Sequence, residues 1–244
     1  MFYQIPYNYG YSKTVKDFIN ERLDIVHTIY FGFANASRAT ILNNKTIEEH
    51  ERCLREFKNK GVKMAYVINQ VIDFEGLDEN DKYFLDSDLV DVVILSQDKA
   101  FDAIYEIYGD KFAYETSRFY FYLKENTGRL LEKSSIIAFG FKEELDKYWD
   151  KVKEANPNMM ISFISNENCY SKCDMKMAHN ANQNLRNNGA DIPKFNCPYI
   201  DKRNFYSEEE VQEVCRLYPI EIIKVCDRAF DDEKLLEHMR KWVK

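Results

Sequence analysis

The stretch SIIAFGFKEELDKYWDKVKEANPNMMISFIS, residues 135–165, contains the pattern that decides the fold. An apolar run at Ser135–Gly140 is followed by a segment of helical periodicity at 142–156, and a second apolar run follows at Met159–Ser165. Pro157 marks the end of the helical segment, because proline cannot continue a helix. A strand, a helix and a second strand in this order predict a parallel strand pair joined by a right-handed crossover.

The same alternation of short apolar runs and helical segments extends over the whole chain. Runs that are almost wholly apolar are typical of strands buried on both faces. We expect eight strands, at Phe2–Pro6, Ile25–Phe33, Lys63–Asn69, Asp91–Ser96, Lys111–Thr116, Ser135–Gly140, Met159–Ser165 and Ile220–Cys226. Thr46 and Ser207 carry the signals that begin a helix, including acidic residues in the first turn.

Eight strands that alternate with helices favour a (β/α)8 barrel, a TIM-like α/β fold in which residues 1–244 form one domain. An open, doubly wound sheet is the alternative. No G-x-G-x-x-G motif follows any of the predicted strands, which weakens the case for a dinucleotide-binding sheet.

The composition limits the classes of function. The chain carries a formal net charge of −7 and no block of lysine and arginine, which argues against general nucleic-acid binding. It contains no run of about 18 apolar residues that could span a membrane, and Met1–Tyr11 lacks the features of a signal peptide. We therefore expect a cytoplasmic protein whose six cysteines form no disulfide framework. Cys53 and Cys215 lie within predicted helices and are expected to be core thiols.

A long polar segment interrupts the alternation between the seventh and eighth strands. Residues 166–203 are rich in asparagine, and part of this segment, 175–187, is compatible with a helix. Barrel enzymes carry their catalytic residues on the loops that follow the carboxyl ends of the strands. A loop of this length in a compact domain usually has a function, so we expect 166–203 to be the functional loop.

Three cysteines of this loop and a fourth at the end of the last strand form a candidate metal site. Cys169 and Cys173 are separated by three residues, and Cys197 follows later in the loop. Cys226 ends the eighth strand and opens onto the same face of the barrel, and His179 is a further candidate ligand. Converging thiolates bind zinc or an iron–sulfur cluster. The alternative is that the loop thiols have no joint role and that Cys226 is a core thiol.

Charged residues near the strand ends are candidates for catalysis and substrate binding. Glu115 lies within an apolar strand, where it is either a general acid or base or the partner of an inward-facing cation such as Lys224. Lys224 and Arg228 share one face of the last strand, which is costly unless that face lines a site. Arg38, Arg118 and Arg228 could together hold a carboxylate or phosphate, since arginine binds these groups through paired hydrogen bonds. Each arginine could instead form a surface salt bridge.

Several short motifs occur in an order that can be compared with known families. They are a strand ending at Pro6, the strand Ile29-Tyr30-Phe31-Gly32 followed by Ser37-Arg38, the strand end Glu115-x-Ser117, the turn Asn166–Cys173, and the last strand Lys224-Val-Cys-Asp-Arg228. In this order they resemble the peptidase U32 family of collagenase-like barrels. The resemblance extends over most of the chain.

The resemblance implies a barrel that carries a [4Fe–4S] cluster. Several family members are thought to add oxygen without O2 when they modify tRNA, rRNA or quinones, and others were named as peptidases. By this resemblance Cys169, Cys173 and Cys197 would be cluster ligands, and Arg228 would belong to the site. In the turn that contains the first two cysteines, Asn166 and Asn168 are expected to bind substrate.

The sequence also departs from the family pattern. Cys169 and Cys173 are closer together than the first cysteine pair of the family, and Cys226 stands where the family has a glutamate. The additional C-terminal domains of the family do not follow the eighth strand. We therefore expect a small-molecule or peptide substrate rather than a large RNA.

Three functional hypotheses remain open. The first is an iron–sulfur enzyme that modifies a small, peptide or nucleotide substrate without O2, with the cluster held by the loop cysteines and Cys226. The second is a hydrolase that uses zinc-bound water or a cysteine nucleophile, for which His179 and His27 are the candidate bases. The third is a barrel without catalytic activity that binds a partner protein.

Overall fold

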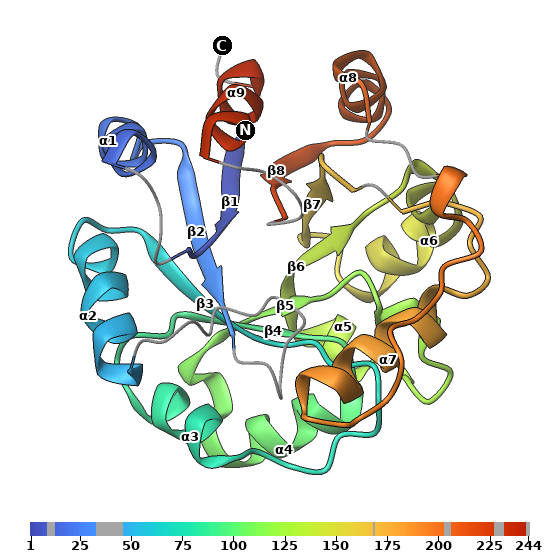
Figure 1. The fold of residues 1–244 in the computed structure, drawn as a ribbon, viewed down its shortest axis with the longest axis horizontal. Coiled ribbons are helices and arrows are strands. Elements are labelled where there is room, and N and C mark those ends of the chain that lie inside the picture. Colours follow the sequence, from blue (N-terminus) through green and yellow to red (C-terminus); the bar gives the residue numbers. More distant parts are fainter. Residues whose placement is uncertain (9–12, 33–45, 168, 203–205, 227–231, 243–244) are drawn as a thin grey trace.

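The computed structural model shows a closed barrel of eight parallel strands, in which each strand pairs with the next along the chain and β8 pairs with β1 (Figure 1). It describes residues 1–8, 13–32, 46–167, 169–202, 206–226 and 232–242. The strands are β1 (Phe2–Pro6), β2 (Val26–Phe31), β3 (Lys63–Ile68), β4 (Val92–Leu95), β5 (Ala113–Thr116), β6 (Ser134–Phe139), β7 (Met160–Ile164) and β8 (Ile220–Lys224). The predicted (β/α)8 barrel is confirmed, and the open sheet is excluded.

Helices follow the strands and surround the barrel (Figure 1). They are α1 (Lys13–Glu21), α2 (Ile47–Lys58), α3 (Glu79–Asp86), α4 (Asp98–Tyr108), α5 (Arg129–Lys133), α6 (Lys142–Ala155), α7 (Lys176–Asn187), α8 (Glu208–Leu217) and α9 (Asp232–Trp242). Short 3-10 helices lie at Gly109–Lys111, Tyr120–Tyr122 and Ile200–Lys202. The helix predicted within the functional loop is α7.

Reciprocal side-chain caps begin three of these helices. Thr46 accepts a hydrogen bond from the backbone of Glu49 at 3.2 Å, and the Glu49 carboxylate accepts one from the Thr46 backbone at 3.0 Å, as predicted. Ser207 caps α8 in the same way. Asp78 and Asp81 form an equivalent acidic pair at the start of α3. These caps satisfy backbone groups that a helix end leaves unpaired.

The apolar core has two layers because the side chains of each strand alternate between the barrel interior and the helices. The outer layer is the larger one and lies between the strands and the helices; for example, Phe31 of β2 packs edge-on against Phe84 of α3. The inner layer is a small cluster inside the barrel, formed by Tyr30, Ala65, Val67, Val92 and Ile94. Other interior positions carry polar side chains, among them Gln4, Glu115 and Lys224, which are described with the candidate site.

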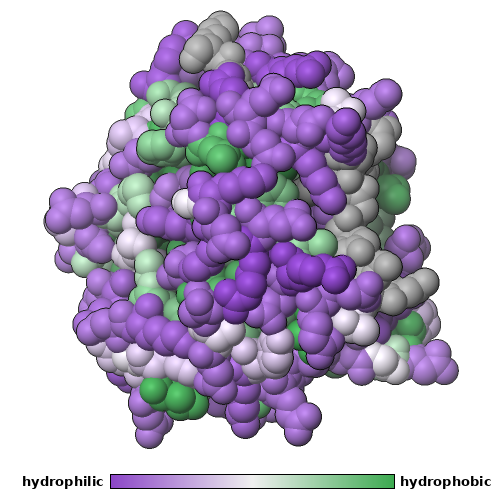
Figure 2. Space-filling view, turned by 90° about the vertical axis from the view of Figure 1, so that its left-hand side faces the viewer, coloured by the Kyte–Doolittle hydropathy of each residue, from purple (hydrophilic) through white to green (hydrophobic). Residues whose placement is uncertain are grey.

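The face of the molecule shown in Figure 2 is predominantly hydrophilic. Figure 2 shows one face of the molecule, on which small hydrophobic areas are separated by hydrophilic side chains. Among the described residues, no helix has both the length and the apolar character needed to cross a membrane.

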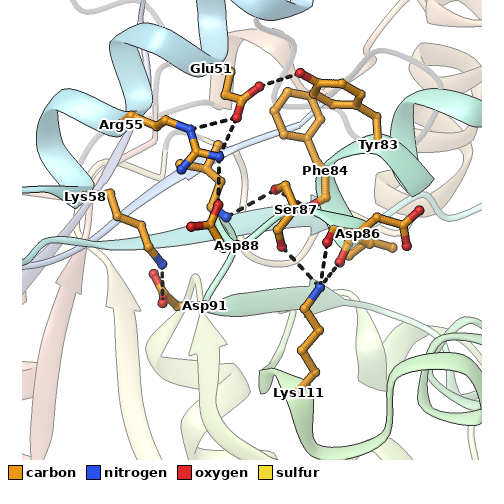
Figure 3. A network of polar contacts seen from close by, with 12 residues as sticks. Glu51, Arg55, Lys58, Tyr83, Phe84, Asp86, Ser87, Asp88, Asp91 and Lys111 are labelled. Carbon is orange, nitrogen blue, oxygen red and sulfur yellow. Dashed lines mark hydrogen bonds and ion pairs between the residues drawn. The ribbon is translucent and has the colours of Figure 1, made fainter.

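A polar network ties α2, α3 and the start of β4 together beside the amino ends of the strands (Figure 3). Arg55 of α2 bonds to Glu51 at 2.6 Å and to Asp88 at 2.7 Å. Lys58 pairs with Asp91 at 2.6 Å, and the same carboxylate accepts a hydrogen bond from the backbone of Met64 in β3. This end of a barrel is generally the one that serves stability rather than catalysis.

Lys111 completes this network by capping the end of α3 (Figure 3). Its Nζ donates to the carbonyl oxygens of Leu85 at 2.5 Å, Asp86 at 3.2 Å and Ser87 at 3.1 Å. The last carbonyl groups of a helix have no partner within the helix, and a cation is favourable there. Lys111 therefore lies before β5 rather than within it, and the predicted start of that strand was too early.

We expect the substitution Lys111→Met to lower the free energy of unfolding by about 1 kcal/mol, because three carbonyl groups lose a charged donor. Chemical denaturation measures this change. Lys124→Met is the matched control, since Lys124 is exposed and should change the stability by less than about 0.5 kcal/mol. Equal effects of the two substitutions would show that the cap contributes nothing.

Asp81 makes the stability of the fold depend on pH. Its carboxylate is buried and accepts a hydrogen bond from the Tyr66 hydroxyl at 2.8 Å. Burial raises the pKa of Asp81 to about 6, although the hydrogen bond from Tyr66 opposes the shift. A folded state that prefers the protonated acid gains stability at low pH and loses it as the pH rises through the folded-state pKa.

We therefore expect Asp81→Asn to increase the free energy of unfolding at pH 7.5 by on the order of 1–3 kcal/mol. At pH 4 the two proteins should have similar stability, because Asp81 is then protonated. Urea denaturation across this pH range measures the difference, with the exposed Asp17→Asn as a control. Stability curves that run parallel at every pH would contradict the assignment.

Candidate functional site

Buried charged side chains gather at the carboxyl ends of β5, β6 and β7. They come from the loops after these strands and from the first turns of α6 and α7, which a parallel barrel brings to the same end. The group consists of Arg118, Tyr122, Glu144, Glu167 and Lys176, and we call it the mouth cluster. Its four charged members are all at most 6% exposed.

Arg118 is held between two carboxylates. Its Nη1 donates to Glu167, and its Nη2 donates to Glu144 at 3.2 Å. The guanidinium lies 4.7 Å from the centre of the Phe141 ring. It also lies against Gly140, where a Cβ atom would be 2.6 Å from the Arg118 Cζ. Glycine at this strand end therefore leaves the space that the guanidinium occupies.

Glu144 is the acceptor on which the mouth cluster converges. Its carboxylate accepts hydrogen bonds from the backbone of Gly140 at 2.8 Å and Phe141 at 3.2 Å, because it lies in the first turn of α6. The Tyr122 hydroxyl donates to the same carboxylate at 2.6 Å. Burial and the neighbouring Glu144 raise the pKa of Tyr122 well above its ordinary value. Tyr122 therefore stays protonated and acts as a donor to Glu144.

Lys176 reaches the cluster from the start of α7. Its Nζ donates to the Tyr122 hydroxyl at 3.1 Å, lies 3.7 Å from Glu144, and sits 4.0 Å from the centre of the Phe141 ring. Burial lowers the pKa of Lys176 to about 8, and the Arg118 charge acts in the same direction. Part of the Lys176 population is therefore a neutral amine near neutral pH.

Lys176 was not among the candidates drawn from the sequence. One signal could have found it: a lysine in the first turn of a helix faces the positive end of the helix dipole, which is unfavourable unless an acidic partner compensates. Glu144 supplies that partner. The partner lies in another loop, so the compensation is not visible in the local sequence.

A second polar group lies on the barrel axis. Glu115 is fully buried and accepts hydrogen bonds from Lys224 and from Gln4, each at 2.6 Å. Lys224 also lies 4.7 Å from the centre of the Tyr30 ring. Lys224 thus points into the barrel as predicted, and its pairing with Glu115 is one of the two roles expected for that carboxylate. The Oε1 atom of Gln4 and the Oγ atom of Ser162 are buried with no partner among the described residues.

The loop cysteines do not form a metal site in this conformation. Cys169 lines a pocket of about 360 Å³ between the loop after β7, α6 and α8, together with Glu143, Tyr170 and Tyr206 among others. Cys197 is buried, whereas Cys173 is half-buried. Within the described part of the chain, no three His, Cys, Asp or Glu side chains lie close enough together to hold a metal ion. As placed, the described cysteines are therefore not gathered into one set of three or more ligands.

Asn166 joins the ends of β7 and β8. Its Nδ2 donates to the carbonyl of Cys226 at 2.5 Å, and its Oδ1 accepts from the Cys226 backbone at 2.7 Å. The amide expected to bind substrate is thus engaged with the chain. Three further candidates, Arg38, Asn168 and Arg228, lie outside the residues that the structure describes. Arg118, the described member of the expected three-arginine clamp, has its charge paired within the mouth cluster.

The two histidines considered as bases occupy different ends of the barrel. His27 is at the start of β2, hydrogen-bonded to Thr28 at 2.6 Å, on the side opposite the cysteine loop. His179 belongs to α7, and its ring stacks on Phe195 with 4.9 Å between the ring centres. His27 therefore does not lie near the cysteines. The thiols Cys53 and Cys215 pack against the apolar core, as expected.

No protein-family profile matches the sequence, and no curated protein sequence matches it. Among solved structures, the U32 peptidase Mk0906 aligns with 94% of this chain and 94% of its own, with a TM-score of 0.58 and 13% identity. An active-site mutant of the β-1,3-glucanosyltransferase of Rhizomucor miehei aligns with 92% of this chain and 86% of its own, but its TM-score of 0.41 and 10% identity are too low to carry an argument. This chain therefore has a U32-like barrel fold.

Proposed function

We propose that this chain is an enzyme of the U32-like barrel type that transforms a small-molecule or peptide substrate at the carboxyl end of the barrel. The mouth cluster is the observation that carries the proposal. Replacing a buried ion pair by apolar side chains is often neutral or even stabilising, so stability alone does not account for four buried charges in one place. Barrel enzymes place their catalytic groups at this end.

Lys176 is the proposed acid–base group. A group whose pKa lies near the working pH transfers protons efficiently, and burial brings the pKa of Lys176 to about 8. Tyr122 and Glu144 contact the amine and fix its position. Arg118 in turn positions Glu144 and Glu167.

Glu115 and Lys224 are the second pair of proposed catalytic groups. They share a hydrogen bond of 2.6 Å on the barrel axis, and Lys224 is the last residue of β8. Glu115 lies in β5 and Arg118 lies two residues after its end, so this strand and its loop connect the pair on the axis with the mouth cluster.

An iron–sulfur enzyme that modifies its substrate without O2 is the metal-dependent form of this proposal. It is supported by the order of the cysteine motifs in the sequence. The cluster would supply the redox chemistry. Because the described cysteines do not lie together, we assign no reaction step to a cluster.

A cysteine-dependent hydrolase is the second candidate. It is supported by the position of Cys169, which lines a pocket of about 360 Å³. This volume is within the range of small-molecule sites. The backbone of Cys169 is held by the Glu167 carboxylate at 3.0 Å, so the pocket and the mouth cluster share one loop.

We expect Lys176→Met to abolish turnover, with at least a hundredfold loss, because general acid–base catalysis contributes about 10²- to 10⁴-fold. The assay incubates the protein with a cell extract of peptides and metabolites and follows the consumed species by mass spectrometry. Lys172→Met is the matched control, since Lys172 is exposed on the same loop and should leave turnover unchanged. If the wild type consumes no species that the Lys176→Met variant leaves unchanged, the proposal that the chain is an enzyme is refuted.

The rate for the consumed species should rise with pH and level off above about 8 if the neutral amine of Lys176 accepts the proton. Lys176→Arg should not restore the rate, because arginine stays protonated. A rate that is independent of pH between 6 and 9 would assign the proton transfer to another group.

Metal analysis of protein purified without oxygen distinguishes an iron–sulfur enzyme, a zinc enzyme and an enzyme without metal. The iron–sulfur form predicts about four irons and four sulfides per chain, with broad visible absorption, both lost in Cys169→Ser and retained in Cys53→Ser. Zinc alone favours a zinc hydrolase or a structural site. Protein that contains no metal eliminates the iron–sulfur and zinc forms and leaves acid–base or thiol chemistry.

A further inference from the structure

The buried face of α7 is polar, which reverses the usual arrangement of an amphipathic helix. Lys176, Asn180 and Asn184 are 4%, 5% and 0% exposed, whereas Leu185 of the same helix is 41% exposed. Residues four positions apart lie on one face of a helix. The three polar side chains therefore form one buried line along α7, which we call the α7 stripe.

Asn184 is the amide of the stripe that the described part of the chain leaves without a partner. Both the Nδ2 and the Oδ1 atoms of Asn184 are buried without a hydrogen-bond partner in the part of the chain that the structure describes. Asn180, one turn earlier on the same face of the helix, is 5% exposed. Buried polar groups nearly always have partners, and those without one are costly. Asparagine is also a poor helix former, so neither the helix nor the core benefits from these residues.

The stripe is continuous with the proposed active site. It begins at Lys176, which contacts Tyr122 and Glu144 of the mouth cluster. Figure 1 shows α7 on the same side of the molecule as α5 and α6. Another side of α7 is held by the returning chain, because Asn182 accepts a hydrogen bond from the backbone of Phe195 at 3.1 Å. The stripe is thus distinct from the face that anchors the helix.

We propose that the α7 stripe binds amide groups of the substrate, and that α7 is the element that closes over them. This inference rests on the proposed function, since it describes how the same site recognises its substrate. An asparagine side chain offers a donor and an acceptor in one plane, and another planar amide offers the complementary pair. Asn184 would then gain the partners that it lacks among the described residues, and Asn180 would add a second contact one turn away.

The spacing of the stripe matches an extended chain. Residues four apart on a helix are separated by about 6 Å along its axis, and alternate residues of an extended peptide are separated by about 6.6 Å. A free carboxamide could satisfy one asparagine, whereas a peptide main chain could satisfy both. A phosphate backbone fits less well, because the cations Arg118 and Lys176 already contact Glu167 and Glu144.

Closure of α7 accounts for the burial of the stripe. The polar side chains are covered in this conformation, so a substrate reaches them only when α7 moves away from the barrel. Exposing a polar face to water is inexpensive, whereas exposing an apolar face is not. A polar inner face therefore suits a helix that opens and closes.

The test replaces Asn184 and Asn180 by leucine in the full chain, with Asn188→Leu as the matched control on an exposed position of the same helix end. We expect Asn184→Leu to raise Tm by about 2–4 °C, because an unpaired buried amide is replaced by an apolar group. Asn188→Leu should leave Tm unchanged. A fall in Tm for Asn184→Leu would show that the chain itself satisfies the amide and would overturn the proposal.

Binding is measured separately by NMR titration of the labelled protein with N-acetyl-tetraalanine amide and with propionamide. We expect the wild type and Asn188→Leu to bind, and Asn180→Leu and Asn184→Leu to bind at least tenfold more weakly. Preference for the peptide identifies a main chain as the ligand, and equal binding per amide identifies a free carboxamide. A fully N-methylated form of the peptide should not bind, because it lacks the N–H donors.

Absence of binding by both probes to the wild type, or binding that the leucine substitutions do not weaken, would overturn the inference. Because the titration involves no turnover, its result is independent of the Lys176 assay. If the probes bind to the stripe but the protein shows no turnover, α7 is a recognition element and the proposal that the chain is an enzyme is rejected. If the protein shows turnover but its stripe binds neither probe, the enzyme proposal stands and the amide-binding proposal is rejected.

Discussion

The pairing of β1 with β8 is the constraint on which the rest of this structure depends. It joins the first and last strands of the chain, with Gln4 beside Lys224 in the register, and so closes the sheet. A closed barrel has no free strand edge. The same closure brings Gln4 and Lys224 within hydrogen-bond distance of Glu115 from the opposite wall. A buried carboxylate between two donors is stable only in this closed form, because an unpaired buried charge is costly.

Closure of a parallel barrel also decides where chemistry can occur. All eight strands run in the same direction, so the loops after β5, β6 and β7 meet at one end. Arg118, Glu144 and Glu167 come from three of these connections, yet they form one buried network. The amino ends of the strands carry ion pairs of a different kind, such as Lys58 with Asp91, whose side chains remain partly exposed. The two ends of the barrel thus differ in how deeply their ion pairs are buried.

The loop after β7, residues 166–203, departs from the packing rules that the rest of the chain follows. Elsewhere local preference and global packing agree: Thr46 and Ser207 cap their helices, and Phe31 packs on a helix from the outer face of its strand. In α7 the buried positions are polar, and Leu185 is exposed. Sequences that specify a stable fold satisfy such rules at every level, and exceptions concentrate at functional sites. The long loop, the buried Lys176 and the unsatisfied amide of Asn184 therefore all support the proposed site.

The sequence by itself determined the repeating architecture. Apolar runs, helix caps and the break at Pro157 are local signals, and they predicted each of the eight strands to within a few residues as well as the barrel that these strands form. Tertiary structure alone decided which side chains meet. Lys176 contacts Tyr122 across 54 positions of sequence, and Lys224 contacts Glu115 across 109. The physical reason is that spacing along a chain reports only neighbours within one element, whereas these contacts depend on how the sheet closes and how the loops pack. For the same reason, four cysteines that share a motif order in the sequence need not converge on one point in space.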